Sequence, residues 1–371
     1  MMAKPVPALE TTIDEVPDAL RKGRGVAGNA SGRFESLSRH RTDDGWWEED
    51  LPPLRTTVTP ETAKTIISSN TSPDLPFDRS INPYRGCEHG CVYCYARPTH
   101  AYLGLSPGLD FESQLFAKTN AREALRAQFW KRGYQCKPIM LGAVTDPYQP
   151  IERDWKLTRG VMEELAECGH PVIITTKSAN ILRDLDILAP MAARGLAAVG
   201  MSVTTMDRTL ARTMEPRAST PGKRLDAIGA LVDAGVPVTI MAAPMIPHLN
   251  DHELENLLCA AAGKGATSAY YSLLRLPLEL KELFSGWLDN HAPDRASRVL
   301  NGVRETRGGK LYQSDFDSRM RGTGEYAGLM EKRFRLACRK LGLNEREPAE
   351  LPLRTDLFKP PALPGSQMAL F

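Results

Sequence analysis

Three cysteines that lie close together are the residues of this chain best suited to chemistry. Cys87, Cys91 and Cys94 have C-x₃-C-x₂-C spacing, and Gly86 and Gly90 give the backbone around them the freedom to fold tightly. A 4Fe-4S cluster is usually held by four cysteines, so three thiolates leave one iron open to another ligand. The spacing therefore predicts an iron–sulfur cluster with one reactive iron.

A zinc ion is the alternative that this spacing leaves open. His89 lies between the first two cysteines and could complete a Cys₃His set, which would form a closed structural site. Zinc-binding folds usually pair two cysteine knuckles, however, and no second knuckle follows in this sequence. The spacing favours iron–sulfur over zinc without deciding between them.

The apolar pattern predicts the elements that must position this loop. Short, continuous runs of apolar residues alternate with helical patterns, as expected for parallel strands that are buried on both faces. The expected strands are residues 81–84, 139–144, 171–176, 197–203, 236–242 and 267–273. Most of their starts lie about 30 residues apart, the length of a βαβ unit. We therefore predict an α/β fold, a partial (β/α)₆ TIM-like barrel with the cysteine loop after its first strand.

Helical patterns fill the intervals and continue beyond the last strand. The expected helices are residues 155–168, 181–189 (ended by Pro190), 221–234, 252–263, 279–289, 293–306 and 325–341. The chain then divides into a largely disordered tail (1–45), an N-terminal arm (46–79), the barrel core (80–278), a helical basic C-terminal extension (279–345) and a Pro-rich tail (346–371).

The composition excludes several classes of protein. With 42% apolar residues, 25% charged residues and a net charge of +2, the chain is neither a collagen-like repeat nor a disordered polyelectrolyte. No run approaches the ~18 apolar residues of a membrane helix, and residues 1–24 lack the apolar core of a signal peptide. We expect a cytoplasmic protein without a membrane partner, in which seven cysteines do not form a disulfide framework. Cys168, Cys259 and Cys338 lie in helical patterns and are expected to be buried.

With Tyr93 at the aromatic position, the cysteines read C-x₃-C-x-Φ-C, and the sequence from about Ser80 to Leu274 resembles the radical S-adenosylmethionine (SAM) superfamily. Within it, the sequence is similar to the group related to spore photoproduct lyase, described as DNA repair photolyase-like. The segments that carry this likeness are Tyr-Arg-Gly-Cys at 84–87, Thr-Asp-Pro-Tyr-Gln-Pro at 145–150, Thr-Thr-Lys at 175–177, Ser-Val-Thr-Thr at 202–205, Glu-Pro-Arg at 215–217 with Arg224, and Ala-Pro-Met-Ile-Pro at 243–247. Each of these segments is expected at the carboxyl end of a strand, where parallel sheets bind ligands.

The resemblance implies a 4Fe-4S cluster on Cys87, Cys91 and Cys94 that reductively cleaves SAM to a 5′-deoxyadenosyl radical, which then takes a hydrogen atom from the substrate. It also implies a separate electron donor such as flavodoxin or ferredoxin. The residues that it assigns to SAM contacts are Tyr93, Thr145, Lys177, Ser202 and Arg224.

Several of these residues have structural alternatives. Tyr93 could simply pack in its loop, and Lys177 could be a solvated side chain at the barrel mouth. Arg224 suits the methionyl carboxylate of SAM, but a structural pair with Asp226 or Glu215 is an equal alternative.

Two acids and one further cysteine receive no role. Asp146 and Glu152 are expected to be pocket acids of unassigned function. In the lyase, a cysteine that donates hydrogen lies at the end of the second strand, where this sequence has Ala143. Cys136 lies at the beginning of that strand and is expected at the opposite end of the barrel, so the lyase's donor chemistry is not carried over.

The substrate is unassigned, with nucleic acid or a nucleotide as the leading candidate. Residues 295–340 hold twelve Lys and Arg against five Asp and Glu, a balance of +7 that could bind phosphates. Tyr312, Phe316 and Tyr326 lie among these charges and could stack on bases or belong to the core. The alternatives are an ordinary basic helical face and, for the whole chain, a zinc-stabilised, non-catalytic nucleic-acid-binding module.

Overall fold

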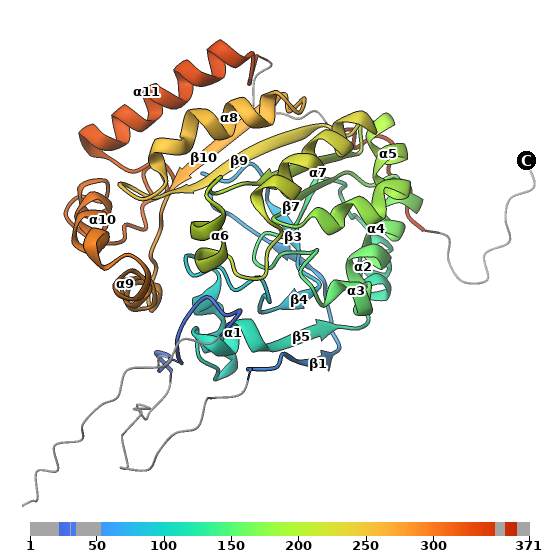
Figure 1. The fold of residues 1–371 in the computed structure, drawn as a ribbon. Coiled ribbons are helices and arrows are strands. Elements are labelled where there is room, and N and C mark those ends of the chain that lie inside the picture. Colours follow the sequence, from blue (N-terminus) through green and yellow to red (C-terminus); the bar gives the residue numbers. More distant parts are fainter. Residues whose placement is uncertain (1–21, 30, 35–52, 346–352, 362–371) are drawn as a thin grey trace, which may run out of the picture.

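A computed structural model describes residues 22–29, 31–34, 53–345 and 353–361, and its centre is a seven-stranded sheet (Figure 1). The strands in spatial order are β10 (Ser268–Leu273), β9 (Val238–Met245), β8 (Ala197–Ser202), β7 (Val172–Thr176), β6 (Ile139–Leu141), β3 (Arg79–Ile81) and β2 (Ile67–Ser69). Neighbours pair in parallel except β2, which is antiparallel to β3. The sheet ends at β10 and β2, which do not pair, so six parallel strands form an open barrel as predicted.

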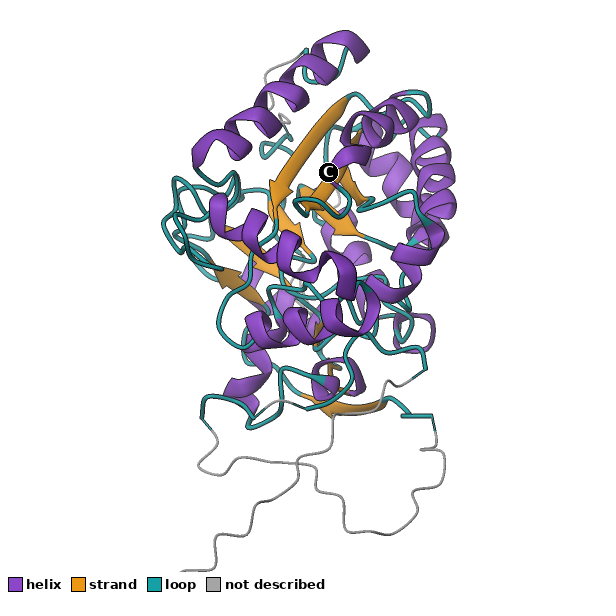
Figure 2. Cartoon of the chain, turned by 60° about the vertical axis from the view of Figure 1, so that its left-hand side comes forward, coloured by secondary structure: helices purple, strands orange, loops and turns teal. Residues whose placement is uncertain are grey.

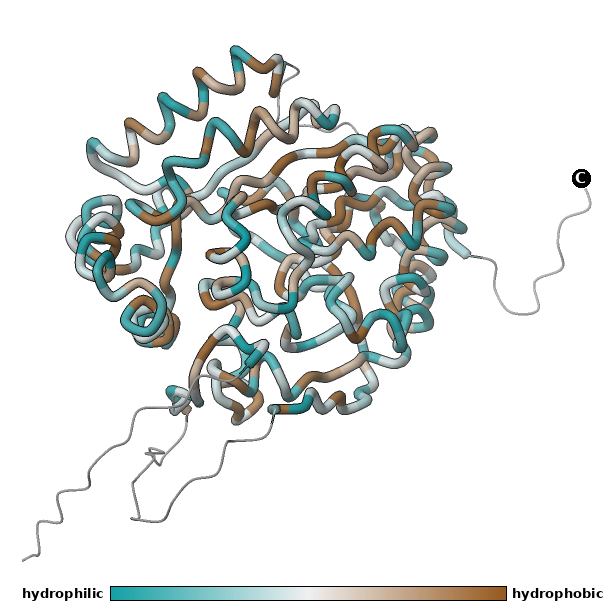
Figure 3. The backbone as a smooth tube through the Cα atoms, viewed as in Figure 1, coloured by the Kyte–Doolittle hydropathy of each residue, from teal (hydrophilic) through white to brown (hydrophobic). Residues whose placement is uncertain are grey.

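Helices cover the outside of this sheet (Figure 2). Those between β6 and β10 are α3 (Glu152–Trp155), α4 (Leu157–Glu167), α5 (Leu185–Ala193), α6 (Arg208–Met214), α7 (Pro221–Asp233) and α8 (Leu254–Ala262), with 3₁₀ turns η2 (Ala179–Asp184) and η3 (Asp251–Glu253). After β10 come α9 (Leu280–His291), α10 (Pro293–Glu305) and α11 (Gly324–Leu341). Hydrophobic residues concentrate in the sheet and on the helix faces against it (Figure 3), and β8 is buried at all six positions.

A second, three-stranded sheet lies beside the barrel and was not predicted from the sequence. It has the order β1 (Thr57–Glu61), β5 (Gln114–Lys118), β4 (Tyr84–Arg85). Helices α1 (Leu109–Ser113) and α2 (Ala121–Phe129) and the 3₁₀ helix η1 (Arg97–Leu103) flank β5 in the chain. The expected strand 81–84 was therefore wrong in extent: the chain leaves the barrel sheet after Ile81 and enters the second sheet at Tyr84. Pro83 lies between them and has no N–H with which to continue a ladder.

Two further expectations were wrong in detail. Pro190 lies inside α5 instead of ending it, because residues 179–184 form η2 and α5 begins only at Leu185. Cys259 is exposed, since α8 turns Leu254, Leu258 and Ala261 inward and leaves Cys259 outside that stripe. Cys168 and Cys338 are buried as expected.

Most of the predicted tails, 1–45 and 346–371, lies outside the described residues. The described parts of both tails make specific contacts with the rest of the chain. Val26 is buried in the same apolar cluster as Cys91. At the other end, the Phe358 ring packs against Phe129 and His170, and the Lys359 N–H donates to the Cys168 carbonyl oxygen. Within the described ranges, no helix combines the length and apolar character needed to cross a membrane.

Candidate functional site

The cysteine loop, residues 86–97, lies where the chain passes from β4 to η1. Short backbone turns fold it. The Gly90 N–H donates to the Cys87 carbonyl oxygen over 3.3 Å, and the Cys94 N–H donates to the Cys91 carbonyl oxygen over 3.2 Å. Gly86 and Gly90 have φ values of 75° and 66°, a conformation that favours glycine. A Cβ on Gly90 would lie 2.6 Å from a Glu112 carboxylate oxygen. The expected need for glycine at both positions is confirmed.

The Arg97 side chain is completely buried and holds the backbone of this loop. Its Nε donates to the Cys91 carbonyl oxygen over 2.9 Å, and Nη2 donates to the Gly90 carbonyl oxygen over 3.0 Å. Nη2 also pairs with Glu112 over 2.5 Å, and Nη1 donates to the carbonyl of Gly108. The backbone that carries the thiols is therefore fixed by a charged, buried anchor.

The three thiols are reduced and lie close enough to affect one another. Cys87 and Cys91 are buried and Cys94 is partly buried. The pKa of the Cys87 thiol is raised well above its ordinary value by burial, then by Asp146, Cys91 and Cys94. Burial likewise raises the pKa of Cys91, with Glu215 adding to the effect. Burial thus disfavours the thiolates of Cys87 and Cys91, and a cationic iron centre bound there would favour them.

The zinc alternative finds no support in this geometry. Across the described ranges, no three His, Cys, Asp or Glu side chains are arranged to hold a single metal ion. The Nδ1 atom of His89 is engaged by Asp146, since it lies 3.3 Å from a carboxylate oxygen of that residue. With His89 paired to Asp146, the donor set is three cysteines, which fits a three-cysteine iron–sulfur cluster better than a Cys₃His zinc site.

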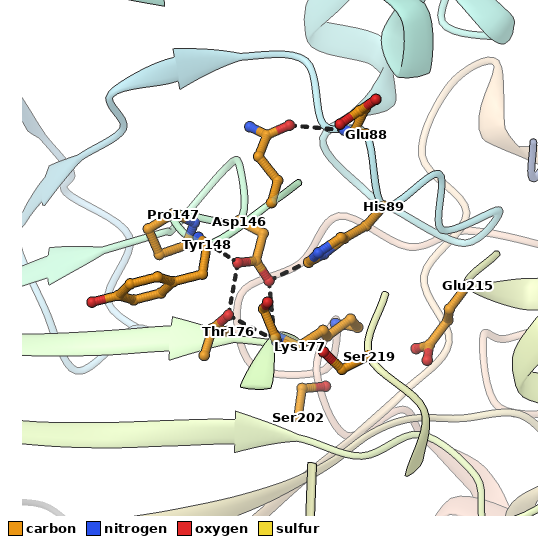
Figure 4. Close-up of polar contacts among 12 residues, drawn as sticks. Glu88, His89, Asp146, Pro147, Tyr148, Thr176, Lys177, Ser202, Glu215 and Ser219 are labelled. Atoms are coloured by element: carbon orange, nitrogen blue, oxygen red, sulfur yellow. Dashed lines mark hydrogen bonds and ion pairs between the residues drawn. The ribbon is translucent and has the colours of Figure 1, made fainter. Parts of the chain in front are cut away.

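Asp146 connects the cysteine loop to the ends of β6 and β7 (Figure 4). Besides His89, its carboxylate accepts hydrogen bonds from the Thr176 hydroxyl and the Lys177 N–H, each over 2.7 Å. Burial alone would raise the pKa of Asp146, but His89 and these donors lower it to about 2. Asp146 is thus an ionised carboxylate that holds His89, Thr176 and Lys177 in place. The sequence had left its role open.

Tyr93 and Arg224 meet at a second buried carboxylate. Glu215 accepts hydrogen bonds from the Tyr93 hydroxyl and, over 2.7 Å, from Thr204, and it pairs with Arg224 Nη2. Arg224 also donates to the carbonyls of Ser219 and Ser202. Of the alternatives for Arg224, the structure forms the pair with Glu215. Its contact with a SAM carboxylate stays a prediction, and all three guanidinium nitrogens already have protein acceptors.

The remaining predicted SAM residues lie at three neighbouring strand ends. Lys177 follows β7 and holds its ammonium 5.7 Å from the centre of the Tyr93 ring. Within the described part of the chain Lys177 has no carboxylate partner. Thr145 is buried and donates to the Tyr84 carbonyl oxygen over 3.3 Å, and Ser202 donates to the Ala243 carbonyl oxygen over 3.3 Å. The structure brings Lys177 and Tyr93 together; cofactor contacts by the four stay predictions.

Glu152 is a structural acid. Its carboxylate accepts from the Tyr84 hydroxyl and from the Thr158 N–H, and it pairs with Arg183 over 2.8 Å. Cys136 precedes β6, at the amino end of the strand, whereas Ala143 follows β6 on the side of the cysteine loop and accepts the Tyr95 hydroxyl. The expected separation of Cys136 from the site agrees with this placement.

The basic segment 295–340 is less available than its charge suggests. Arg307 is buried and donates to the carbonyls of Ser318 and Leu274. Arg319 pairs with Asp74 through both carboxylate oxygens. Arg333 pairs in the same way with Glu255, and the Tyr326 hydroxyl donates to Asp251. These residues support the fold, so the picture of one continuous phosphate-binding face was too broad.

Sequence reasoning missed the groups that hold the loop. Arg97 directly follows the cysteine motif, which was a usable signal, but its partner Glu112 lies fifteen residues further on with no pattern to mark it. Gly25 packs on the loop from the N-terminal segment: its N–H donates to Glu112 over 2.9 Å. Arg24 adds a hydrogen bond to the Glu112 carbonyl oxygen over 2.7 Å. Nothing local in residues 22–29 indicates this contact.

Residues 81–259 match the sequence model of the Radical SAM superfamily. An uncharacterized protein of Mycobacterium tuberculosis is 38% identical over 226 residues, which cover 60% of this chain and 66% of that protein. One from Methanocaldococcus jannaschii is 28% identical over 60% of this chain and 79% of its own length. The aligned part thus spans just under two thirds of the mycobacterial relative. A structure of spore photoproduct lyase complexed with dinucleoside spore photoproduct superposes with a TM-score of 0.55 at 17% identity, covering 77% of this chain and 80% of that one. This likeness shows a shared fold.

Proposed function

We propose that this chain, whose residues 81–259 match the Radical SAM superfamily model, cleaves SAM at a cluster held by Cys87, Cys91 and Cys94 to act on a nucleotide or nucleic acid. The superfamily uses a 4Fe-4S cluster and SAM, and the match over residues 81–259 supports radical SAM catalysis by this chain. The cluster ligands, the residues that bind SAM and the substrate are parts of the proposal.

One observation carries the assignment of the cluster ligands. Three reduced thiols share a loop whose backbone is anchored by Arg97 and whose neighbours at the strand ends are already organised. When bound, a reduced 4Fe-4S cluster supplies the electron that splits SAM into methionine and a 5′-deoxyadenosyl radical. The protein's own task is to hold SAM in one orientation and to exclude water.

The side chains around the loop suit that task. Lys177 presents an ammonium without a carboxylate partner in the described ranges, and it suits the carboxylate of SAM. The Tyr93 ring beneath it offers a flat surface for the adenine, and the Glu215 carboxylate fixes the ring through the Tyr93 hydroxyl. Arg224 serves as a positioning residue, because it neutralises Glu215 and ties that acid to the Ser202 carbonyl.

The proposed nucleotide or nucleic-acid substrate rests on chemistry at the open side of the site. Tyr95, the residue after the third cysteine, is 51% exposed and lies beneath the Arg275 guanidinium, whose carbon is 5.5 Å from the ring centre. An exposed aromatic ring beside a cation suits a base with its phosphate. The lyase likeness agrees with such a substrate and does not identify the lesion or the reaction. The lyase type of reaction and an electron donor such as flavodoxin or ferredoxin likewise remain parts of the proposal.

The test is an anaerobic comparison of wild type, Cys91→Ala and Cys168→Ala. Wild type should hold about four irons per chain and release 5′-deoxyadenosine when reduced in the presence of SAM. Cys91→Ala should lose both properties, and Cys168→Ala, a buried cysteine at the far end of α4, should keep both. Protein that holds one zinc and forms no 5′-deoxyadenosine would overturn the proposal. Deuterium transferred from labelled DNA or RNA into 5′-deoxyadenosine would then identify the substrate.

A further inference from the structure

Two arginines without an acidic partner lie together after β10. Arg275 follows the strand directly, and Arg307 follows α10 and returns to donate to the Leu274 carbonyl oxygen over 2.8 Å. Across the described residues, neither guanidinium is paired with a carboxylate. Burial and then the charge of Arg275 lower the pKa of Arg307 to about 10. The carbonyl oxygens of Ser318, Leu273 and Leu274 compensate the Arg307 charge in part, whereas Arg275 has no oxygen acceptor in the described residues, so an anion beside Arg275 would be favourable.

Buried polar atoms that lack a hydrogen-bond partner gather at the same place. They include Nε of Arg275, Nε of Arg307 and Oγ of Ser318. Arg307 Nη1 donates to the Ser318 carbonyl oxygen over 2.9 Å, so these groups are neighbours and not scattered defects. Because nearly all buried polar atoms in folded proteins have partners, a local group of orphaned atoms indicates a missing ligand.

The free side of Arg275 matches an oxyanion. Its Nη1 faces the Met320 sulfur at 3.4 Å, which leaves Nε and Nη2 without an acceptor among the described residues. These two nitrogens lie on one edge of the guanidinium, and such an edge binds the paired oxygens of a carboxylate or phosphate. The geometry therefore favours a planar, two-point contact with an anion.

Exposed aromatic rings on the same side favour a phosphate over a carboxylate. Tyr95 is 51% exposed beneath Arg275, and Phe316 is 46% exposed with the Arg319 guanidinium carbon 4.7 Å from its ring centre. Arg275 Nη1 lies 3.4 Å from the sulfur of Met320, the residue after Arg319, so the two aromatic–arginine pairs share one region. Rings interleaved with arginines are the arrangement that binds the bases and backbone of single-stranded nucleic acid.

We propose that Arg275, with Arg307 behind it, binds a phosphate group of the substrate, and that Tyr95 and Phe316 offer surfaces on which the adjoining bases stack. The phosphate belongs to a nucleotide or to a single-stranded oligonucleotide. This subsite deepens the proposed function and rests on it, because it gives the phosphate contact of the same substrate. It lies beside the cysteine loop, since Tyr95 follows Cys94 directly.

The test measures binding by the reconstituted holoenzyme under anaerobic conditions. The probes are inorganic phosphate, thymidine monophosphate and a fluorescein-labelled ten-residue thymidine oligonucleotide, followed by calorimetry or fluorescence anisotropy. Arg275→Gln should weaken oligonucleotide binding about tenfold or more and should reduce the magnitude of its salt slope by about 0.7, the value for one phosphate contact on a single strand. Arg298→Gln, which removes an exposed cation of the same basic segment, is the matched control and should change binding less than about twofold.

Two further variants keep the result decisive. Phe316→Ala, at an exposed position, should weaken the oligonucleotide about fivefold or more and leave thymidine monophosphate unchanged if the bases extend from Arg275 toward Phe316. Arg275→Lys keeps the charge and loses the two-point edge, so it should fall between wild type and Arg275→Gln, and it replaces the glutamine variant if that fails to fold. Equal binding of thymidine monophosphate and the oligonucleotide would assign the site to a free nucleotide.

The proposal is overturned if Arg275→Gln and Arg298→Gln weaken binding equally, or if neither phosphate nor either nucleotide binds the wild type. Formation of 5′-deoxyadenosine is measured on the same wild-type preparation. Protein that binds oligonucleotide through Arg275 and cleaves no SAM retains this subsite and loses the proposed function. Protein that cleaves SAM and binds no phosphate retains the proposed function and loses this subsite.

Discussion

Replacing Arg97 should detach the cysteine loop from its support. Arg97 and Glu112 are both completely buried, and their contact is 2.5 Å long. Removing one member of a buried pair leaves the other as an uncompensated charge, which costs about 3–5 kcal/mol. Arg97→Met also strips the Cys91 and Gly90 carbonyl oxygens of their charged donor. We expect a loss of about 3–5 kcal/mol in unfolding free energy and weaker retention of iron.

The assay compares thermal unfolding of the metal-free protein with the rate at which a chelator extracts iron from the reconstituted protein. Lys264→Met is the control, because its pair with Asp226 over 2.9 Å is exposed and such pairs contribute about 1 kcal/mol or less. The double variant Arg97→Met, Glu112→Gln separates the causes. If the stranded carboxylate is the main cost, this variant should be more stable than Arg97→Met alone while still losing iron quickly.

Two results would refute this reasoning. Arg97→Met that unfolds at the wild-type temperature would show that the buried pair contributes little to the fold. A destabilised Arg97→Met that keeps iron as firmly as wild type would show that the loop does not depend on this anchor.

Glu215→Gln should lower the unfolding free energy by about 3–5 kcal/mol, because Arg224 loses its buried anion, and calorimetry that finds no loss would contradict the pairing. Gly25→Ala should speed iron extraction, since a Cβ there would lie 1.8 Å from the Gly90 carbonyl oxygen; Gly222→Ala, with open space around its Cβ, is the control that should behave as wild type. Burial lowers the pKa of His170 from 6.5 to about 4. As the pH falls, the unfolded chain therefore binds a proton at His170 before the folded chain does. The free energy of unfolding should be about 2–3 kcal/mol lower at pH 4.5 than above pH 6.5. Thermal unfolding of His170→Gln should show a correspondingly weaker dependence on pH over this range.

The barrel could be predicted because each parallel strand carries its own local signal. Runs such as 172–176 are apolar, short and bounded by turn residues, and the interval between them fixes the βαβ order. The second sheet carries no such signal. β1 and β5 are separated by more than fifty residues and form a parallel pair in which Thr57 aligns with Gln114. Pairing of that kind depends on tertiary contacts, because polar strands with one exposed face resemble loops in sequence.

The site divides along the same line. The spacing of the cysteines predicted the cysteine loop, and the ends of the expected strands predicted where Lys177 and Ser202 lie. Both predictions depend only on position in the chain. The partners of the charged groups could not be assigned in this way. Whether Arg224 faces a ligand or Glu215 depends on a contact between a helix start and the segment after α6. Net charge was equally uninformative: Arg319 and Arg333 count as free cations in the sequence and are paired with Asp74 and Glu255 in the structure.

Two buried arginine–carboxylate pairs bracket the cysteine loop. Arg97 and Glu112 hold the backbone of Gly90 and Cys91 from one side, and Arg224 and Glu215 hold the Tyr93 hydroxyl from the other. Neither pair uses a thiol, so the loop is positioned by protein groups alone. In a small zinc domain, by contrast, metal binding supplies the folding free energy. Here two buried ion pairs, four charges in all, hold the loop through protein groups that no metal supplies. Preorganisation of this kind suits a catalytic centre, which must hold its reacting groups in one geometry, more than a structural metal site.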